Sequence, residues 1–255
     1  MIVQYPGPSI QNTAPRIQFP ESRTQNPAPR PAMLYKTTGI VFRFTEYGET
    51  SIIVNIFTRL FGLQSYIVNG VRTKSAKHTI SLYQPLTLLD LVVYHRETAN
   101  IMRIKEVRCL HAYQNIHLDI RKSTIALFLN EILNKAVKDQ SNADSISDFL
   151  VRSFVALDQL QGIENFHLVF LIKLSRHLGF GPQITQEVLE GFSVSQAEEQ
   201  ALDFFLSAEY EQHIPLPHAV RKGLLEILLN FYRRHLENLG EVRSVEVLKE
   251  ILNES

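Results

Sequence analysis

Residues 36–71 read KTTGIVFRFTEYGETSIIVNIFTRLFGLQSYIVNGV. Short runs rich in β-branched and aromatic residues are separated here by two turn signals, Tyr47-Gly48-Glu49 and Phe61-Gly62. Runs of this length, bounded by glycine-containing turns, are typical of antiparallel β-strands. The stretch therefore predicts three consecutive strands.

The same pattern continues as far as Cys109, and no helical period within it is long enough for a βαβ crossover. The polar stretch 72–81 and the turn 95–97 separate two further runs. This pattern predicts a small antiparallel barrel or sandwich, and a five-stranded OB-fold is the natural candidate. The five expected strands are 36–44, 50–58, 63–71, 82–94 and 100–109.

Beyond Cys109 the apolar residues recur with the 3.6-residue period of helices. We expect a helix that ends at Gly179, another after Pro217, and a last short helix capped by Ser244. The fold class is therefore α+β, an N-terminal five-stranded OB-fold barrel followed by an all-α helical bundle. An uninterrupted helical face is formed by Ile125, Phe128, Leu129, Ile132, Leu133, Ala136 and Val137.

Three parts are expected along the chain. Residues 1–32 hold seven of the eleven prolines and form a disordered or extended leader, which we expect to be dispensable for the fold. Residues 33–109 form the barrel and residues 110–255 the helical domain. Because the chain has a single cysteine, no secretory signal and no apolar run long enough to span a membrane, it fits the cytoplasm.

The formal net charge of zero hides an asymmetry. Residues 1–32 carry net +2, residues 33–108 net +5 and residues 109–255 net −7. Sorting of this kind suggests that the barrel meets a polyanion and that the helical half contacts proteins.

The common catalytic constellations are missing from the sequence. There is no phosphate-binding P-loop, no G-x-S-x-G and no H-E-x-x-H, and the nine histidines are dispersed. Asp139, Asp144 and Asp148 straddle an expected loop and are interpreted as solvated charges. The sequence thus predicts no enzyme, no cofactor and no metal site.

The barrel combines cations with aromatic rings, as a single-stranded nucleic-acid groove requires. The strongest candidates for contacts with DNA are three cations within six residues, because they can converge on one stretch of phosphates: Arg72, Lys74 and Lys77. The alternative is that the tyrosines are core and the cations only solubilise the barrel. The DNA-binding candidates are Arg43, Arg59, Tyr66, Arg72, Lys74, Lys77, Arg96 and Arg103.

Several stretches together resemble the bacterial recombination mediator family RecO, over Met33 to about Asn253. The resemblance lies in residues 47–51 (YGETS), 57–58 (FT), Gly62, 69–75 (NGVRTKS), 84–86 (QPL), 231–236 (FYRRHL) and 242–248 (VRSVEVL).

This resemblance implies a non-enzymatic factor of DNA repair and homologous recombination in the RecF pathway, acting in the cytoplasm at the nucleoid. It implies binding of single- and double-stranded DNA, annealing of complementary strands and, with RecR, loading of RecA onto strands coated by single-strand binding protein. The family's basic loop corresponds to Arg72 and Lys74. Many members carry a four-cysteine zinc module, which would fall between Gly181 and Pro217, where this chain has no cysteine.

A second class of function stays open. The barrel could be a protein-binding module and the chain an adaptor without direct DNA binding, with the acidic helical half as its main surface. The salt dependence of oligonucleotide binding separates the two hypotheses, because a phosphate-tracking groove gives a steep slope.

Overall fold

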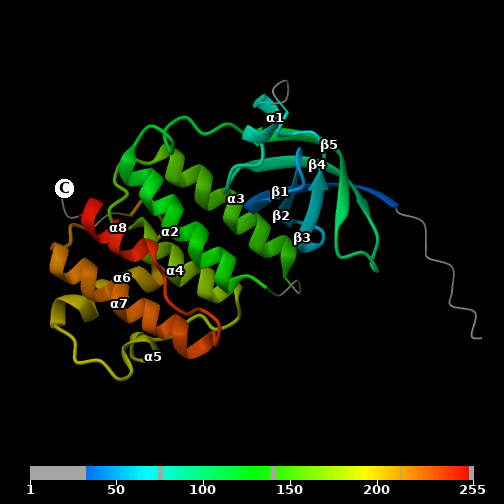
Figure 1. Cartoon of the computed structure of the whole chain (residues 1–255). Coiled ribbons are helices and arrows are strands. Elements are labelled where there is room, and N and C mark those ends of the chain that lie inside the picture. The colour runs from blue at the N-terminus through cyan, green and yellow to red at the C-terminus, as the bar shows by residue number, and fades with distance from the viewer. Residues whose placement is uncertain (1–32, 74–76, 139–141, 213, 253–255) are drawn as a thin grey trace, which may run out of the picture. The chain divides into compact units, whose positions relative to one another are not determined.

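The computed structural model describes residues 33–73, 77–138, 142–212 and 214–252 (Figure 1). The expected leader, residues 1–32, lies outside the described residues, and so does Lys74.

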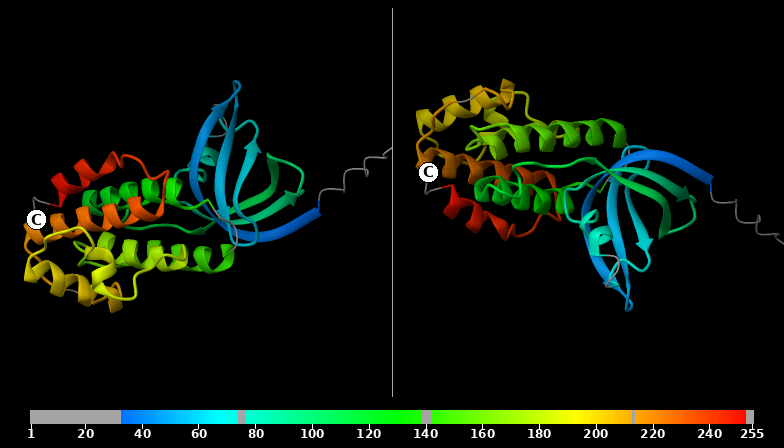
Figure 2. Two further views of the ribbon diagram at one scale, coloured as in Figure 1. Left: turned by 90° about the horizontal axis from the view of Figure 1, so that it is seen from below. Right: turned by 90° about the horizontal axis from the view of Figure 1, so that it is seen from above.

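Five strands close into a barrel in the order β1-β2-β3-β5-β4 (Figure 2). All neighbours are antiparallel except β3 and β5, which are parallel where Tyr66 faces Met102 and Ile67 faces Arg103. This confirms the predicted OB-fold. The strands are β1 (Met33–Tyr47), β2 (Ser51–Thr58), β3 (Gly62–Val68), β4 (Leu88–His95) and β5 (Met102–His111).

The length and bend of β1 allow the barrel to close. Its first part, 33–40, pairs with β4, and its second part, 39–47, pairs with β2, with an irregularity in the register between Val41 and Arg43. Gly39 lies where the two pairings overlap, and a Cβ atom there would lie 2.6 Å from Cγ2 of Ile56. The strands can therefore approach this closely only because residue 39 has no side chain.

Eight helices are found among the described residues, and helices predominate after the barrel. The described helices are α1 (Lys77–Ser81), α2 (Ile120–Ala136), α3 (Ala143–Gln159), α4 (Phe166–His177), α5 (Thr185–Leu189), α6 (Gln196–Ser207), α7 (His218–His235) and α8 (Ser244–Ile251). Gly179 adopts φ 87° just beyond α4, which confirms the predicted helix end.

Three local expectations were wrong. The polar stretch 72–81 contains the short helix α1, and residues 82–87 precede strand β4 instead of opening it. Asp144 and Asp148 do not lie in a loop, because α3 begins at Ala143 and both belong to it. Ser244 is the first residue of α8, and its hydroxyl donates to Glu131 instead of capping the helix.

The barrel and the helices share one apolar core. Phe42 of β1 and Phe57 of β2 stack with ring centroids 5.7 Å apart, and both belong to the same buried cluster as α2 residues such as Phe128. Asn134 of α2 donates from Nδ2 to the carbonyl oxygen of Phe42 at 3.2 Å. One face of the barrel is therefore covered by helices.

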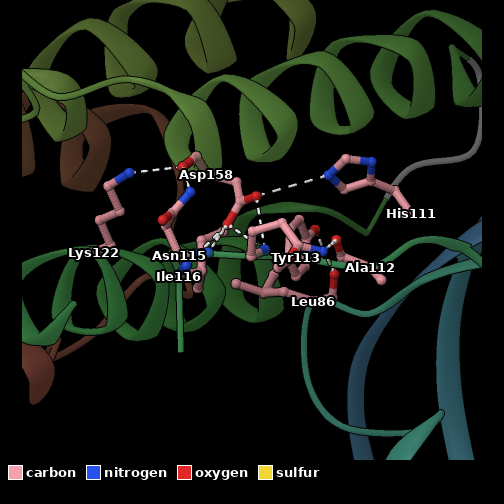
Figure 3. A network of polar contacts seen from close by, with 9 residues as sticks. Leu86, His111, Ala112, Tyr113, Asn115, Ile116, Lys122 and Asp158 are labelled. Carbon is pink, nitrogen blue, oxygen red and sulfur yellow. Dashed lines mark hydrogen bonds and ion pairs between the residues drawn. The ribbon is translucent and has the colours of Figure 1, made fainter. Parts of the chain in front are cut away.

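A buried carboxylate fixes the connection that leads from β5 to α2 (Figure 3). Asp158, at the end of α3, is 2% exposed and accepts the backbone N–H groups of Gln114, Asn115 and Ile116 at 2.7–3.1 Å. Lys122 of α2 donates to the Asp158 carbonyl oxygen at 2.7 Å. Burial alone would raise the pKa of the Asp158 carboxyl, but the three backbone N–H donors outweigh it and hold the pKa below its ordinary value.

Candidate nucleic-acid interface

The outer face of the barrel carries a polar row across its first three strands. Arg43 of β1 lies opposite Asn55 of β2, which lies opposite Ser65 of β3. The Ser65 hydroxyl donates to Oδ1 of Asn55 at 3.2 Å. Since residues directly opposite each other point to the same face, this row places a guanidinium beside two hydrogen-bonding side chains.

A second row runs parallel to the first and crosses all five strands. Each member lies opposite the next in the strand pairing, and each is at least partly exposed. The row therefore joins apolar, cationic and aromatic side chains on one continuous surface. Its members, in order, are Thr45, Ile53, Ile67, Arg103 and Tyr94.

Three predicted cations are free to meet a ligand. Arg43, Arg96 and Arg103 are exposed, and within the described part of the chain none of them forms an ion pair or donates a side-chain hydrogen bond. An unpaired surface guanidinium can replace the counterions of a phosphate without first breaking a contact inside the protein. Arg43 and Arg103 lie in the two neighbouring rows, and Arg96 follows β4.

Two other predicted cations are held by carboxylates. Arg59 lies 3.0 Å from Asp148 of α3. Arg72 lies 2.7 Å from Glu46 and also donates to the carbonyl oxygen of Gly48 at 3.0 Å, so it fixes the turn between β1 and β2. Arg72 is therefore not a free surface cation.

The structure describes the side chain of neither lysine of the predicted basic loop. Lys74 lies outside the described residues, and Lys77 begins α1, but its side chain is not described. The convergence of Arg72, Lys74 and Lys77 on one phosphate stretch stays a prediction.

Tyr66 does not belong to the surface. Its side chain is fully buried in the barrel core, as is nearly all of Tyr83, and burial raises the pKa of the Tyr83 hydroxyl to about 12. Neither ring can stack on a base from inside the core. Tyr47 and Tyr94 are 54% and 38% exposed, so their rings are accessible to a ligand.

Arg108 was missed by the sequence reasoning. It is exposed on β5 opposite Asp90 of β4, and no ion pair to it is formed among the residues described. The sequence could have indicated Arg108, because it lies in the same expected strand, 100–109, as Arg103.

The segment between Gly181 and Pro217 does not fit a zinc module. It contains no cysteine, and in the described residues no group of three or more histidine, cysteine, aspartate or glutamate side chains could hold a metal ion. Arg234 of α7 organises part of the segment instead. It donates to the carbonyl oxygens of Glu187 and Val188 at 3.0 Å and lies 2.8 Å from the Glu190 carboxylate.

These features define a class of protein: a five-stranded OB-fold barrel with a cationic outer face, joined through a shared core to a helical bundle. Two family models match the chain. Residues 33–113 match "Recombination protein O N terminal" and residues 117–244 match "Recombination protein O C terminal".

Relatives named DNA repair protein RecO extend the match. Those of Flavobacterium johnsoniae and Flavobacterium psychrophilum are 31% and 33% identical over 237 and 238 residues, which are 87% of this chain and all of each relative. That of Bacteroides fragilis is 32% identical over 242 residues, with the same coverage. The chain belongs to the RecO family and has a role in DNA repair and recombination.

None of the helices in the described ranges is long and apolar enough to cross a membrane.

Proposed function

We propose that the outer face of the barrel binds the phosphate backbone of single- and double-stranded DNA. The observation that carries the proposal is a set of three guanidinium groups that have no ion-pair partner among the described residues, on and beside two neighbouring side-chain rows: Arg43, Arg96 and Arg103. Cations that track a backbone bind mainly by releasing its condensed counterions. In OB-folds the face of the second and third strands and the adjoining loops commonly bind oligonucleotides.

This binding would serve a recombination mediator that is not an enzyme. The chain would anneal complementary strands and, with RecR, help to load RecA onto strands coated by single-strand binding protein, in the cytoplasm at the nucleoid. Membership of the RecO family supports this proposal. Annealing needs a surface that holds a strand by its backbone and leaves the pairing edges of its bases free, which the exposed cations of the barrel would provide.

A protein-binding adaptor is the second candidate, favoured by the net charge of −7 on residues 109–255. An adaptor without DNA contacts would show no salt-dependent binding to an oligonucleotide.

The first test is a salt titration of single-stranded DNA binding by the full chain and the double variant Arg43→Ala/Arg103→Ala. Loss of two phosphate contacts should reduce the slope of log K against log salt by about 1.4 and weaken binding about tenfold or more at physiological salt. Arg233→Ala is the matched control, because Arg233 is an exposed cation of α7. An unchanged slope in the double variant would contradict the proposed surface.

A further inference from the structure

An exposed apolar side chain and an exposed aromatic ring lie side by side at one end of the barrel, where β1 begins and β4 ends. Leu34 of β1 is directly opposite Tyr94 of β4, so the two side chains point to the same face. We call this pair the rim patch. Leu34 is 48% and Tyr94 is 38% exposed.

A stacked aromatic cluster supports the rim patch from the inner side. The rings of Phe61 and His95 are nearly parallel, with centroids 3.7 Å apart, and Tyr35 packs edge-on against Phe61 at 5.1 Å. Tyr35 also donates from its hydroxyl to Sδ of Met33 at 3.7 Å. The two strands that carry the rim patch are therefore held by packed rings on their other face, which reduces the entropy lost when a ligand binds to the patch.

Tyr94 lies between an apolar and a cationic neighbour. On one side Leu34 of β1 is directly opposite it, and on the other side Arg103 of β5 is directly opposite. Arg96 follows two residues later in the chain. An exposed ring beside unpaired cations suits an unstacked base whose phosphate lies next to it.

The charge around the patch argues for nucleic acid as its occupant. Arg96 and Arg103 are exposed and, in the described part of the chain, have no carboxylate partner. The patch is also continuous with the proposed DNA surface, because Arg103 and Tyr94 end the row that starts at Thr45. An apolar protein segment would leave the guanidinium groups without a counter-charge.

We infer that the rim patch stacks bases of single-stranded DNA and so makes the barrel prefer single strands to duplexes. Bases inside a duplex are already stacked on each other and cannot lie against Tyr94, whereas the backbone contacts serve both forms. The inference rests on the proposed DNA binding and adds the selection of one strand form to it.

The test compares Tyr94→Ala with the unmodified full chain on three probes of equal length: a single-stranded oligonucleotide, an abasic single strand and a duplex. The variant should bind the normal single strand about tenfold more weakly, which corresponds to about 1.4 kcal/mol. Binding to the abasic strand and to the duplex should stay unchanged, and so should the salt slope, because no cation is removed.

Two variants and a control make the result specific. Tyr94→Phe keeps the ring and should keep the affinity, and Leu34→Ser, which removes the apolar neighbour, should also weaken single-strand binding. Leu127→Ala is the control, because Leu127 is a 54% exposed apolar residue of α2 in the helical half. Melting curves of all variants verify that they fold.

Equal weakening on normal and abasic strands would overturn the inference, since Tyr94 would then contact the backbone. Unchanged affinity for the normal single strand in both Tyr94→Ala and Leu34→Ser would overturn it too, and would point to a protein at the rim patch. Both outcomes leave the proposed function intact. Absence of any salt-dependent DNA binding by the unmodified chain would overturn the proposed function itself.

Discussion

At the scale of single residues, Glu131 of α2 holds the start of α8. Its carboxylate accepts the backbone N–H groups of Arg243 and Ser244 at 2.9–3.0 Å and the Ser244 hydroxyl at 2.6 Å. Burial alone would raise the pKa of Glu131, but these donors, together with Lys135, lower it to about 2. A residue more than a hundred positions away thus caps the last helix.

Replacing this carboxylate should change how stability depends on pH. Because the folded pKa of about 2 lies below the unfolded value of 4.5, the contribution of Glu131 is complete above pH 4.5 and is lost as the pH falls toward 2. Glu131→Gln should cost about 1–2 kcal/mol at pH 7 and lose less stability than the unmodified chain between pH 4.5 and 2. Denaturant titrations at several pH values measure this, with the exposed Glu237→Gln as control.

At the scale of elements, Arg234 of α7 holds residues 187–190 in place. Its guanidinium lies against the end of α5, close to three backbone carbonyl oxygens and one carboxylate. Carbonyl groups at the end of a helix lack intrahelical partners, and a cation there satisfies them and interacts favourably with the helix dipole.

Arg234→Ala should therefore loosen α5 without unfolding the chain. We expect a loss of about 1–2 kcal/mol, and faster hydrogen exchange of the amides in residues 185–192 than in α7. Arg233→Ala, one residue earlier and exposed, should change neither measurement. Unchanged exchange in the Arg234 variant would mean that apolar contacts, such as those of buried Val188, are sufficient to hold α5.

The elements that were predicted correctly are those with a strong local period. The uninterrupted apolar series in 125–137 predicted α2, and the β-branched run in 50–58, bounded by turn signals, predicted β2. The period of α3 was also present, in Ile146, Phe149, Leu150 and Phe154, but its aspartates and serines were interpreted as a loop. An aspartate in the first turn in fact favours a helix. The five-residue helix α1 has no such period to reveal it.

The site was less predictable, because strand register decides which side chains are available. Arg72 forms an ion pair with Glu46 only because the fold brings it next to the turn between β1 and β2. The sequence alone does not show which residues that far apart are paired. Tyr66 points inward while its neighbour Ile67 points outward, and a shift of one residue in register would exchange them. The sequence identified the cations of the barrel, but it could not show which of them lack a carboxylate partner in the described structure.

At the scale of the whole molecule, the barrel is not separable from the helices. Ile40, Phe42, Phe57 and Leu88 are buried against the helical core, so the excised barrel would expose them to water. Assays of DNA binding therefore belong on the full chain. The connection between β5 and α2 then becomes part of the fold, and its central group is Asp158.

Removing that carboxylate should destabilise both halves together. Asp158→Ala would leave the N–H groups of Gln114, Asn115 and Ile116 without their acceptor, and we expect a cost of about 3 kcal/mol or more. For a chain of this size that lowers the melting temperature by ~6–12 °C. Asp148→Asn is the control on the same helix, because Asp148 is half exposed and its pair with Arg59 lies in solvent, where it contributes at most about 1 kcal/mol.

The form of the transition distinguishes a shared core from two independent domains. Since β5 leads into the connection that Asp158 holds, loss of far-UV circular dichroism and of tyrosine fluorescence should coincide in the unmodified chain and in Asp158→Ala, shifted by the same amount. The chain has nine tyrosines and no tryptophan, so the fluorescence reports on both halves without interference. Two separate transitions in the unmodified chain would show that the barrel folds independently. A single shifted transition would show that the contacts around Asp158 and the core around Phe42 act as one cooperative unit.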